Sequence, residues 1–180
     1  SAPEEQADSE KAKQILEQKN LLPMEFTLKV PNSSKFYLDT AQSIREQLKD
    51  IGITVNLEMV EWATWLSDVY TNRKYVASLA GLAGKMEPDA ILRRYTSTYA
   101  KNFTNFNNAR YDLLVEEAKR TSNEAKQIEN YKEAQKILSE EQAAIFLMDP
   151  NIIIATEKGI EGFEFYPLPY LNFAKLYFKK

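Results

Sequence analysis

Apolar and polar residues alternate strictly in two stretches of the first third of the chain. Apolar side chains occupy every second position of residues 24–30, and residues 53–60 begin with the same pattern. A period of two is typical of a strand with one buried face. A third apolar run, residues 75–82, has the length of a buried strand. These runs predict the three central strands of a sheet.

Helical periodicity separates the predicted strands. Apolar residues recur near intervals of three and four between Phe36 and Ile51, and Gly52 follows as a residue that ends a helix. A shorter amphipathic segment, residues 62–70, follows the second strand. Strand, helix, strand, helix and strand in this order require crossover connections. The sequence therefore predicts an α/β fold, with a mixed sheet and crossover helices.

The second half of the chain is richer in helical patterns. Pro88 is a favourable first residue for a helix that extends to about Tyr95. Beyond it the pattern predicts two helices, at residues 111–119 and 123–142. Two apolar strands follow at residues 144–148 and 152–156, and an apolar segment at residues 171–178 closes the chain.

One domain accounts for nearly all of these elements. Residues 1–8 are polar and are interpreted as a disordered leader or linker, so the predicted α/β lobe covers residues 9–180. The predicted core consists of apolar residues from both halves: Phe26, Leu28, Ile44, Leu48, Ile53, Val55, Leu57, Leu79, Leu114, Ile137 and Leu138.

Composition narrows the chemistry that the chain can perform. The 180 residues include no cysteine and no histidine, which excludes disulfides, cysteine nucleophiles, Ser-His-Asp triads and His- or Cys-ligated metals. The 23 basic and 26 acidic residues are interspersed, and no basic stripe indicates a nucleic-acid partner. Two pairs of carboxylates, Glu58 with Glu61 and Glu116 with Glu117, are interpreted as solvated charges. We expect no metal, no cofactor and no enzymatic activity.

Several local patterns carry a family resemblance. In chain order they are AKQILEQKN, AQSIREQLKDIGITVNLEMVEWATWL, LAGLAGKMEPDAIL, NFNNARYDLLVEEA, NYKEAQKILSEEQAAIFL and KGIEGFEF. From about Lys11 to its end, the chain resembles the C-terminal portion of the family 5 extracellular solute-binding proteins. Members of this family are peptide and nickel receptors of bacterial ABC importers.

This resemblance implies a type II-like periplasmic binding protein fold, in which two lobes close on a ligand. The chain would form most of the C-terminal lobe, with residues 150–180 as a tail towards the absent N-terminal lobe. It would capture peptides or a related small solute outside the membrane and deliver them to ABC permease subunits. It would be periplasmic, or held at the outer face of the cell membrane by a lipid anchor on the full-length chain.

A cell-surface protein-interaction domain without a small-molecule ligand is the alternative. Neighbouring permease and ATPase genes would favour a function in transport, and a short free-standing gene would favour the interaction domain.

The sequence also departs from the peptide-binding members of the family. Those members place a Trp and an Asp before an Asp-Pro-Asp segment, and the Asp pairs with the α-ammonium of the peptide. Here Leu82 takes the Trp position, and Gly84 or Lys85 takes the acid position. The resemblance and Lys85 together predict a ligand that is blocked, neutral or acidic at this point, or one that is recognised mainly through its backbone.

The candidate ligand-binding residues lie in the loop after the third predicted strand and among nearby aromatic side chains. Ligands of open α/β sheets bind beyond the carboxyl ends of the strands, which places the loop at the cleft. The candidates are Gly84, Lys85, Glu87 and Asp89 in the loop, and Trp62, Trp65 and Tyr95 as an aromatic wall.

Overall fold

The computed structural model describes residues 8–149, 153–166 and 172–179, and these divide between two compact units, Ser1–Leu82 and Ala83–Lys180. No helix in these described ranges is long and apolar enough to cross a membrane. Of the predicted leader, residues 1–7 lie outside the described residues, and Asp8 caps the first helix by accepting a hydrogen bond from the Lys11 amide at 2.8 Å. The prediction of a single lobe over residues 9–180 stays a prediction.

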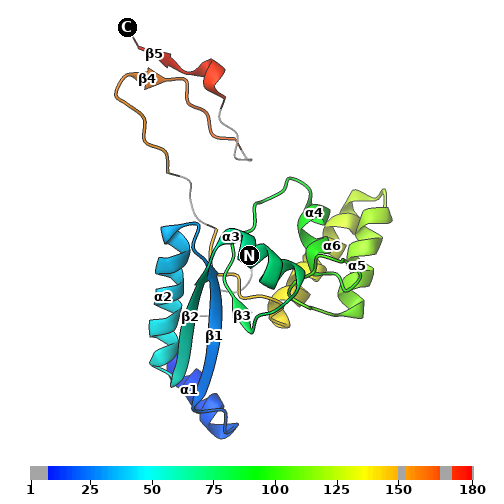
Figure 1. Ribbon diagram of the computed structural model, residues 1–180. Coiled ribbons are helices and arrows are strands. Elements are labelled where there is room, and N and C mark those ends of the chain that lie inside the picture. The colour runs from blue at the N-terminus through cyan, green and yellow to red at the C-terminus, as the bar shows by residue number, and fades with distance from the viewer. Residues whose placement is uncertain (1–7, 150–152, 167–171, 180) are drawn as a thin grey trace. The chain divides into compact units, whose positions relative to one another are not determined.

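The first unit contains a three-stranded sheet with helices along it (Figure 1). Its elements are α1 (Ser9–Gln18), β1 (Met24–Pro31), α2 (Lys35–Lys49), β2 (Ile53–Val60), α3 (Trp62–Trp65), the π-helix η1 (Leu66–Thr71) and β3 (Ala77–Ser78). The strand order is β2-β1-β3, and both pairings are parallel. The α/β class is therefore confirmed, and the described part of this sheet is parallel throughout.

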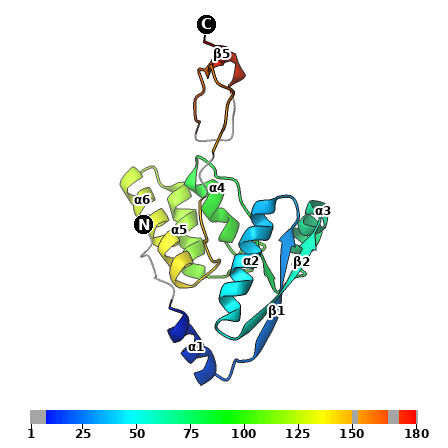
Figure 2. The same ribbon diagram turned by 90° about the vertical axis from the view of Figure 1, so that its left-hand side faces the viewer.

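The alternating pattern places opposite faces of β1 in different surroundings. Leu28 and Val30 are buried in a core cluster with residues of β2 and α2, and α2 packs along these two strands (Figure 2). Lys29 points to the other face, where it contacts Asp68 in η1. Gly52 has a φ of +87°, a left-handed conformation that glycine adopts without steric cost. It therefore lets the chain turn from α2 directly into β2.

The third predicted strand is much shorter than its apolar run. Of residues 75–82, only Ala77 and Ser78 pair with β1. The amide of Leu79 adds one more hydrogen bond to Lys29 O, at 3.2 Å. The predicted strand is thus right in its place in the sheet and wrong in its length.

The second unit is built around a helical core. Its elements are α4 (Pro88–Leu92), the 3₁₀-helix η2 (Arg93–Tyr95), α5 (Ala109–Arg120), α6 (Glu124–Glu140), β4 (Ile160–Glu161), the 3₁₀-helix η3 (Phe173–Lys175) and β5 (Tyr177–Phe178). Asn108 and Asn123 cap α5 and α6 through their side-chain oxygens, at 2.8 and 3.1 Å. Leu114, Ile137 and Leu138 belong to this core, as predicted.

The two apolar strands predicted after α6 are absent from the described residues. Residues 144–148 form no strand, and Ile145 is 79% exposed. Ile152 lies outside the described residues, and residues 153–156 form no strand. An apolar run lacks a strand's backbone hydrogen bonds unless another strand lies beside it. None of the described strands pairs with either run.

A two-stranded antiparallel sheet lies near the end of the chain. β4 and β5 pair through Ile160 with Phe178 and Glu161 with Tyr177. Gly162 makes this pairing possible, because its φ is +84° and an added Cβ would lie 1.9 Å from Lys175 O. The closing apolar segment thus forms a 3₁₀-helix and a short strand, while Leu171 lies outside the described residues.

Candidate ligand-binding site

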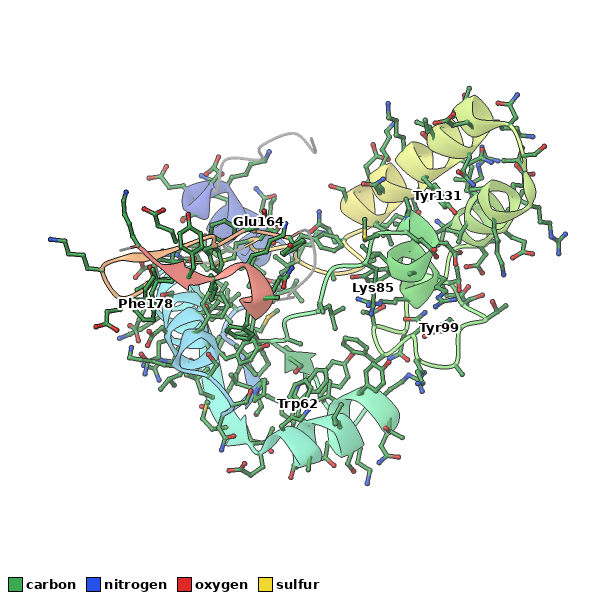
Figure 3. The ribbon with its side chains drawn as sticks, turned by 90° about the horizontal axis from the view of Figure 1, so that it is seen from above. Trp62, Lys85, Tyr99, Tyr131, Glu164 and Phe178 are labelled. Carbon is green, nitrogen blue, oxygen red and sulfur yellow. The ribbon has the colours of Figure 1, made fainter. Side chains whose placement is uncertain are left out.

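Three aromatic side chains of the first unit form a continuous stack. The rings of Trp62 and Trp65 are nearly parallel, 4° apart in plane and 5.0 Å apart between centroids. Trp65 also stacks on Tyr70, with 6.2 Å between centroids. Trp65 is 1% exposed, whereas Trp62, which Figure 3 labels, is 42% exposed. The stack therefore has a buried centre, and Trp62 presents open aromatic surface at one end.

Hydrogen bonds fix the centre of this stack to the sheet. Trp65 Nε1 donates to Ser78 Oγ at 2.9 Å, and Ser78 Oγ donates in turn to Lys29 O at 2.8 Å. A buried indole N–H needs such an acceptor, because an unpaired polar group is costly to bury. The short strand β3 thus positions Trp65, which in turn supports the ring of Trp62.

Lys29 forms a charged cluster with Asp68 and Glu58 that the sequence analysis missed. Its ammonium lies 3.1 Å from Asp68 Oδ2 and 3.3 Å from Glu58 Oε1, and the residue is 8% exposed. Burial lowers the pKa of Lys29, but hydrogen bonds and charge attraction from Asp68 and Glu58 outweigh it, so the pKa is raised overall. Alternation predicted only that Lys29 leaves the core face, and π-helix η1 covers that second face.

The predicted binding loop presents its glycine and lysine openly. Gly84 and Lys85 are both exposed (Figure 3 labels Lys85). No atom lies within 4 Å of a Cβ added at Gly84, so packing does not require glycine there. The amide of Gly81, at the start of the loop, donates to Tyr37 Oη at 3.2 Å.

The two acids of the loop have different surroundings. Glu87 is exposed and occupies the N-cap position of α4, but its side chain makes no capping hydrogen bond. Asp89 is half-buried and lies 3.7 Å from Arg93 Nη1, one turn further along. Because α4 has only five residues, its dipole adds little positive potential at this end.

Tyr95 belongs to the core of the second unit. It is 7% exposed and meets Phe146 edge to face, with 6.2 Å between ring centroids. Burial raises the pKa of its phenol. Tyr95 and Trp65 therefore offer almost no surface to a ligand in this structure, and Trp62 is the exposed member of the predicted aromatic wall.

The predicted site residues are divided between the two units. Trp62 and Trp65 lie together in the first unit, and the five others lie in the second: Gly84, Lys85, Glu87, Asp89 and Tyr95. Their role in ligand binding stays a prediction. No group of three or more His, Cys, Asp or Glu residues in the described ranges could hold a metal ion.

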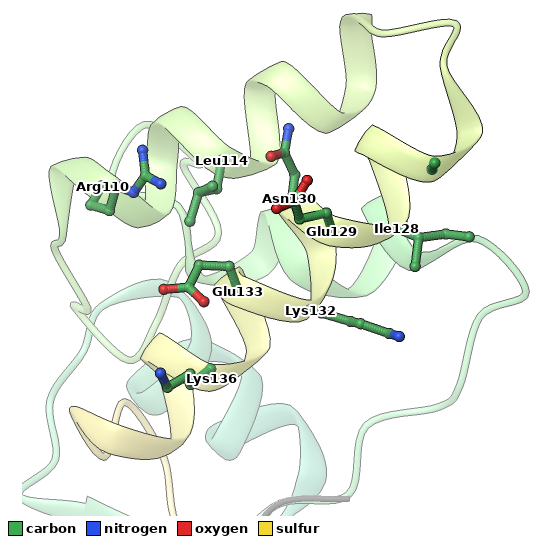
Figure 4. A pocket seen from close by; sticks show the side chains of 9 residues that line it. Arg110, Leu114, Ile128, Glu129, Asn130, Lys132, Glu133 and Lys136 are labelled. Carbon is green, nitrogen blue, oxygen red and sulfur yellow. The ribbon is translucent and has the colours of Figure 1, made fainter.

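Sequence reasoning also missed a groove between α5 and α6. It measures about 660 Å³, and residues of both helices line it (Figure 4). Asn130 on its wall is 6% exposed, and its side-chain nitrogen has no hydrogen-bond partner among the described residues. A single asparagine on the buried side of a predicted helix is the only sequence signal for this groove.

Comparison with known proteins identifies the family. Residues 1–103, more than half of the chain, match the family described as bacterial extracellular solute-binding proteins, family 5 Middle. The chain belongs to this family. It is 30% identical over 145 residues to the oligopeptide-binding protein AppA of Bacillus subtilis, covering 79% of this chain. It is 29% identical over 178 residues to the peptide transport periplasmic protein SapA of Haemophilus influenzae, covering 93% of it.

Solved structures of this family agree with the fold. The structure of Bacillus subtilis AppA in complex with a nonapeptide matches the whole chain with a TM-score of 0.83 and 28% identity. The chain covers 39% of that protein, and 27% and 31% of the curated AppA and SapA sequences. It therefore spans well under half the length of these family members, and the predicted family and fold are confirmed.

Proposed function

We propose that the chain is part of the substrate-binding component of a bacterial ABC importer. In this role it captures peptides or a related small solute outside the membrane and delivers them to the permease. One observation carries the proposal: the 30% identity to an oligopeptide-binding protein over 79% of the chain. The fold match to AppA, which covers the chain completely, supports it.

The same proposal includes partners and location. The chain acts with an N-terminal lobe, with residues 150–180 extending towards it, and with ABC permease subunits. It is periplasmic, or held at the outer face of the cell membrane by a lipid anchor on the full-length chain, and it needs no cofactor and catalyses no reaction. The relatives named above support this view, because both carry names of peptide binding or peptide transport proteins.

Within the binding site, Trp62 is proposed to supply an aromatic wall and Trp65 to hold it in place. The stacked geometry and the 42% exposure of Trp62 support this division of roles. Gly84, Lys85, Glu87 and Asp89 are proposed to contact the ligand from the loop. Tyr95, which is 7% exposed, is proposed to support this loop from the core and not to touch the ligand itself. Lys85 makes this loop unsuitable for a free ammonium, so the preferred ligand is blocked, neutral or acidic there.

Peptide uptake tests the proposed function. Deleting the gene in its native bacterium should abolish uptake of labelled oligopeptides that the parent strain imports, and restoring the gene should recover it. Unchanged uptake of every peptide, together with neighbouring genes that encode neither permease nor ATPase, would contradict the transport role and favour a surface interaction domain.

Titration with matched peptides tests the proposed site in the 180-residue chain. A micromolar receptor binds with about 8 kcal/mol, and half of its contacts leave roughly millimolar affinity. An N-acetylated peptide should bind more tightly than its free-amine form. Lys85→Asp should reverse this order, and the control Lys101→Asp, at another exposed lysine of the second unit, should preserve it. A native preference for the free amine would contradict the proposed role of Lys85.

A further inference from the structure

Pro31 limits how far β3 can pair with β1. In a parallel ladder, alternate residues of a strand turn both their N–H and their C=O to the same neighbouring strand. Lys29 O accepts a hydrogen bond from the amide of Leu79 at 3.2 Å, so Pro31 is the next residue of β1 that faces β3. Because proline has no N–H, Pro31 cannot donate to the carbonyl of Leu79. The ladder therefore ends at Leu79, before the end of the apolar run.

The hydroxyl of Tyr37 accepts the hydrogen bond that would come next in the ladder. Alternation along β3 turns the amide of Gly81 to the same side as that of Leu79, and the Gly81 amide donates to Tyr37 Oη at 3.2 Å. Tyr37 lies in the first turn of α2, the helix that follows β1 in the chain. The tyrosine hydroxyl thus takes the place of the Pro31 carbonyl at the point where the pairing stops.

The ring of Tyr37 is held from several sides. It is partly buried against the core cluster of the first unit, and it meets the ring of Phe36 edge to face, with 6.0 Å between centroids. Its backbone is fixed as well, because the Tyr37 amide donates to Ser34 O at 3.1 Å and the Ser34 side chain caps α2. A ring held in this way gives its hydroxyl a defined position.

The contact between Gly81 and Tyr37 leaves no room for a side chain on the glycine. A Cβ added to Gly81 would lie 2.8 Å from Tyr37 Oη, well inside normal contact distance, and 3.6 Å from two carbons of the ring. Gly84, further along the loop, has no atom within 4 Å of an added Cβ. Glycine is therefore required at position 81 by the contact with Tyr37, and this requirement does not extend to Gly84.

This contact lies where the candidate binding loop begins. Residues 81–88 are all exposed. Further along, Arg94 Nη2 donates to Ala83 O at a long 3.5 Å, and the amide of Ala90 donates to Glu87 O at 3.1 Å as α4 begins. The hydrogen bond to Tyr37 therefore sets the position and the direction in which the loop leaves the sheet.

We propose that Tyr37 is a positioning residue of the ligand-binding site. By accepting the hydrogen bond of the Gly81 amide, it fixes the start of the loop that carries Gly84 and Lys85, and it acts through the backbone without touching the ligand. The inference rests on the proposed function for its ligand, while the fixing of Gly81 can be measured without one.

Amide hydrogen exchange in the 180-residue chain measures this fixing directly. Tyr37→Phe removes the acceptor and keeps the ring, so the Gly81 amide should exchange about tenfold faster. Amides of β1 and β2 should keep the parental rates, because the packing of the ring is unchanged. Tyr177→Phe is the matched control. It removes a hydroxyl that donates to Glu161 Oε2 at 2.9 Å, and it should leave the exchange of Gly81 unchanged.

Alanine at position 81 tests the close contact. Gly81→Ala should displace the loop from Tyr37 Oη and lower the protection of the amide at position 81 about tenfold. The same substitution in the Tyr37→Phe background should add little, because the oxygen and its hydrogen bond are already gone. Gly84→Ala is the control for the change of residue type and should leave the protection of the Gly81 amide at its parental value.

Calorimetric titration with N-acetylated trialanine links the loop to the ligand. The parent chain should bind this peptide with roughly millimolar affinity. Tyr37→Phe should weaken binding at least about threefold, because fewer molecules hold the loop in its binding position. Tyr177→Phe should bind as the parent does. A parent chain that binds no peptide would count against the proposed function, whereas exchange at Gly81 would still decide whether Tyr37 fixes the loop.

Three outcomes would overturn the proposal. Equal protection of the Gly81 amide in Tyr37→Phe and the parent would show that the hydroxyl does not hold the loop. A loss of protection spread evenly over β1, β2 and α2 would make Tyr37 a core residue only. Faster exchange at Gly81 with an unchanged affinity for the peptide would show that the start of the loop does not position the ligand contacts.

Discussion

The two units of the chain bury apolar residues by different means. In Ser1–Leu82 the alternating residues of β1 and β2 lie on one face of a sheet and pack against α2. In Ala83–Lys180 the core is formed by helices. Ala144 and Phe146 of the apolar run that follows them contact this core, but Phe146 and its neighbours Ile145, Leu147 and Met148 are exposed. Ile153, for example, is 91% exposed, whereas Val30 is 0% exposed. Apolar character therefore decides burial only where a neighbouring element supplies the opposite surface.

The largest expected effect on stability comes from removing Trp65, the buried centre of the aromatic stack in the first unit. Trp65→Ala should lower the free energy of unfolding by about 3–5 kcal/mol, because it leaves a large cavity and frees the Ser78 hydroxyl. Urea unfolding measures this loss. Trp62→Ala is the matched control and should cost much less, since Trp62 is 42% exposed. Equal losses for both variants would mean that Trp62 is as deeply packed as Trp65.

A matched pair of leucines shows whether the units are stabilised separately. Leu28→Ala and Leu138→Ala, 5% and 3% exposed, should each cost about 2–5 kcal/mol. If the units unfold independently, each variant should lower only one of two transitions seen by calorimetry. A single transition that both variants shift equally would show that the two units unfold together.

These core residues also show how much of the structure the sequence predicts. Leu28, Val55 and Leu138 could be assigned to the core because a period of two or of about 3.6 specifies a buried face. Ile145 and Ile153 could not be placed, because periodicity reports a suitable side chain and not the presence of a partner strand.

The candidate site was less predictable for a related reason. Trp62 and Trp65 could be singled out as aromatic residues, but the burial of Trp65 depends on its contact with Ser78 of β3, which lies 13 residues further along the chain. Lys29 has the spacing of an exposed strand residue, yet it is 8% exposed because η1 covers that face and supplies Asp68. Asn130 has no sequence signal beyond its helical position. Buried polar groups depend on tertiary contacts that a local pattern does not contain.

An intermediate effect concerns the buried charge of the first unit and its dependence on pH. The pKa of Lys29 is higher in the folded than in the unfolded chain, so the folded chain holds this proton more strongly. Its contribution to stability is fully present below the unfolded pKa of about 10.4 and is lost as the pH rises through the folded pKa. Lys29→Met should therefore flatten the fall in unfolding free energy above about pH 10.

Other groups set the background of this measurement. Burial also raises the pKa of Tyr111, Tyr95 and Tyr131, so stability falls at alkaline pH in every variant. Only the difference between variant and parent reports on Lys29. Lys35→Met, which removes an exposed ion pair with Asp39, is the control and should leave the pH profile unchanged. Profiles of Lys29→Met and parent that run parallel up to pH values of about 11 would contradict the assignment.

The smallest expected effect concerns the exposed apolar run of the second unit and sharpens the comparison most. Ile153→Ser should change the unfolding free energy of this chain by no more than about 0.5 kcal/mol, because a 91% exposed side chain has no packing to lose. Ile137→Ser is the matched control at a buried position and should unfold the helical core at a much lower urea concentration. If a protein that also contains the proposed N-terminal lobe loses more than about 2 kcal/mol with Ile153→Ser, that lobe supplies the missing surface. A loss of this size in the 180-residue chain itself would instead show that the Ile153 side chain is packed within this chain. The contrast between an exposed Ile153 and a buried Val30 would then be wrong.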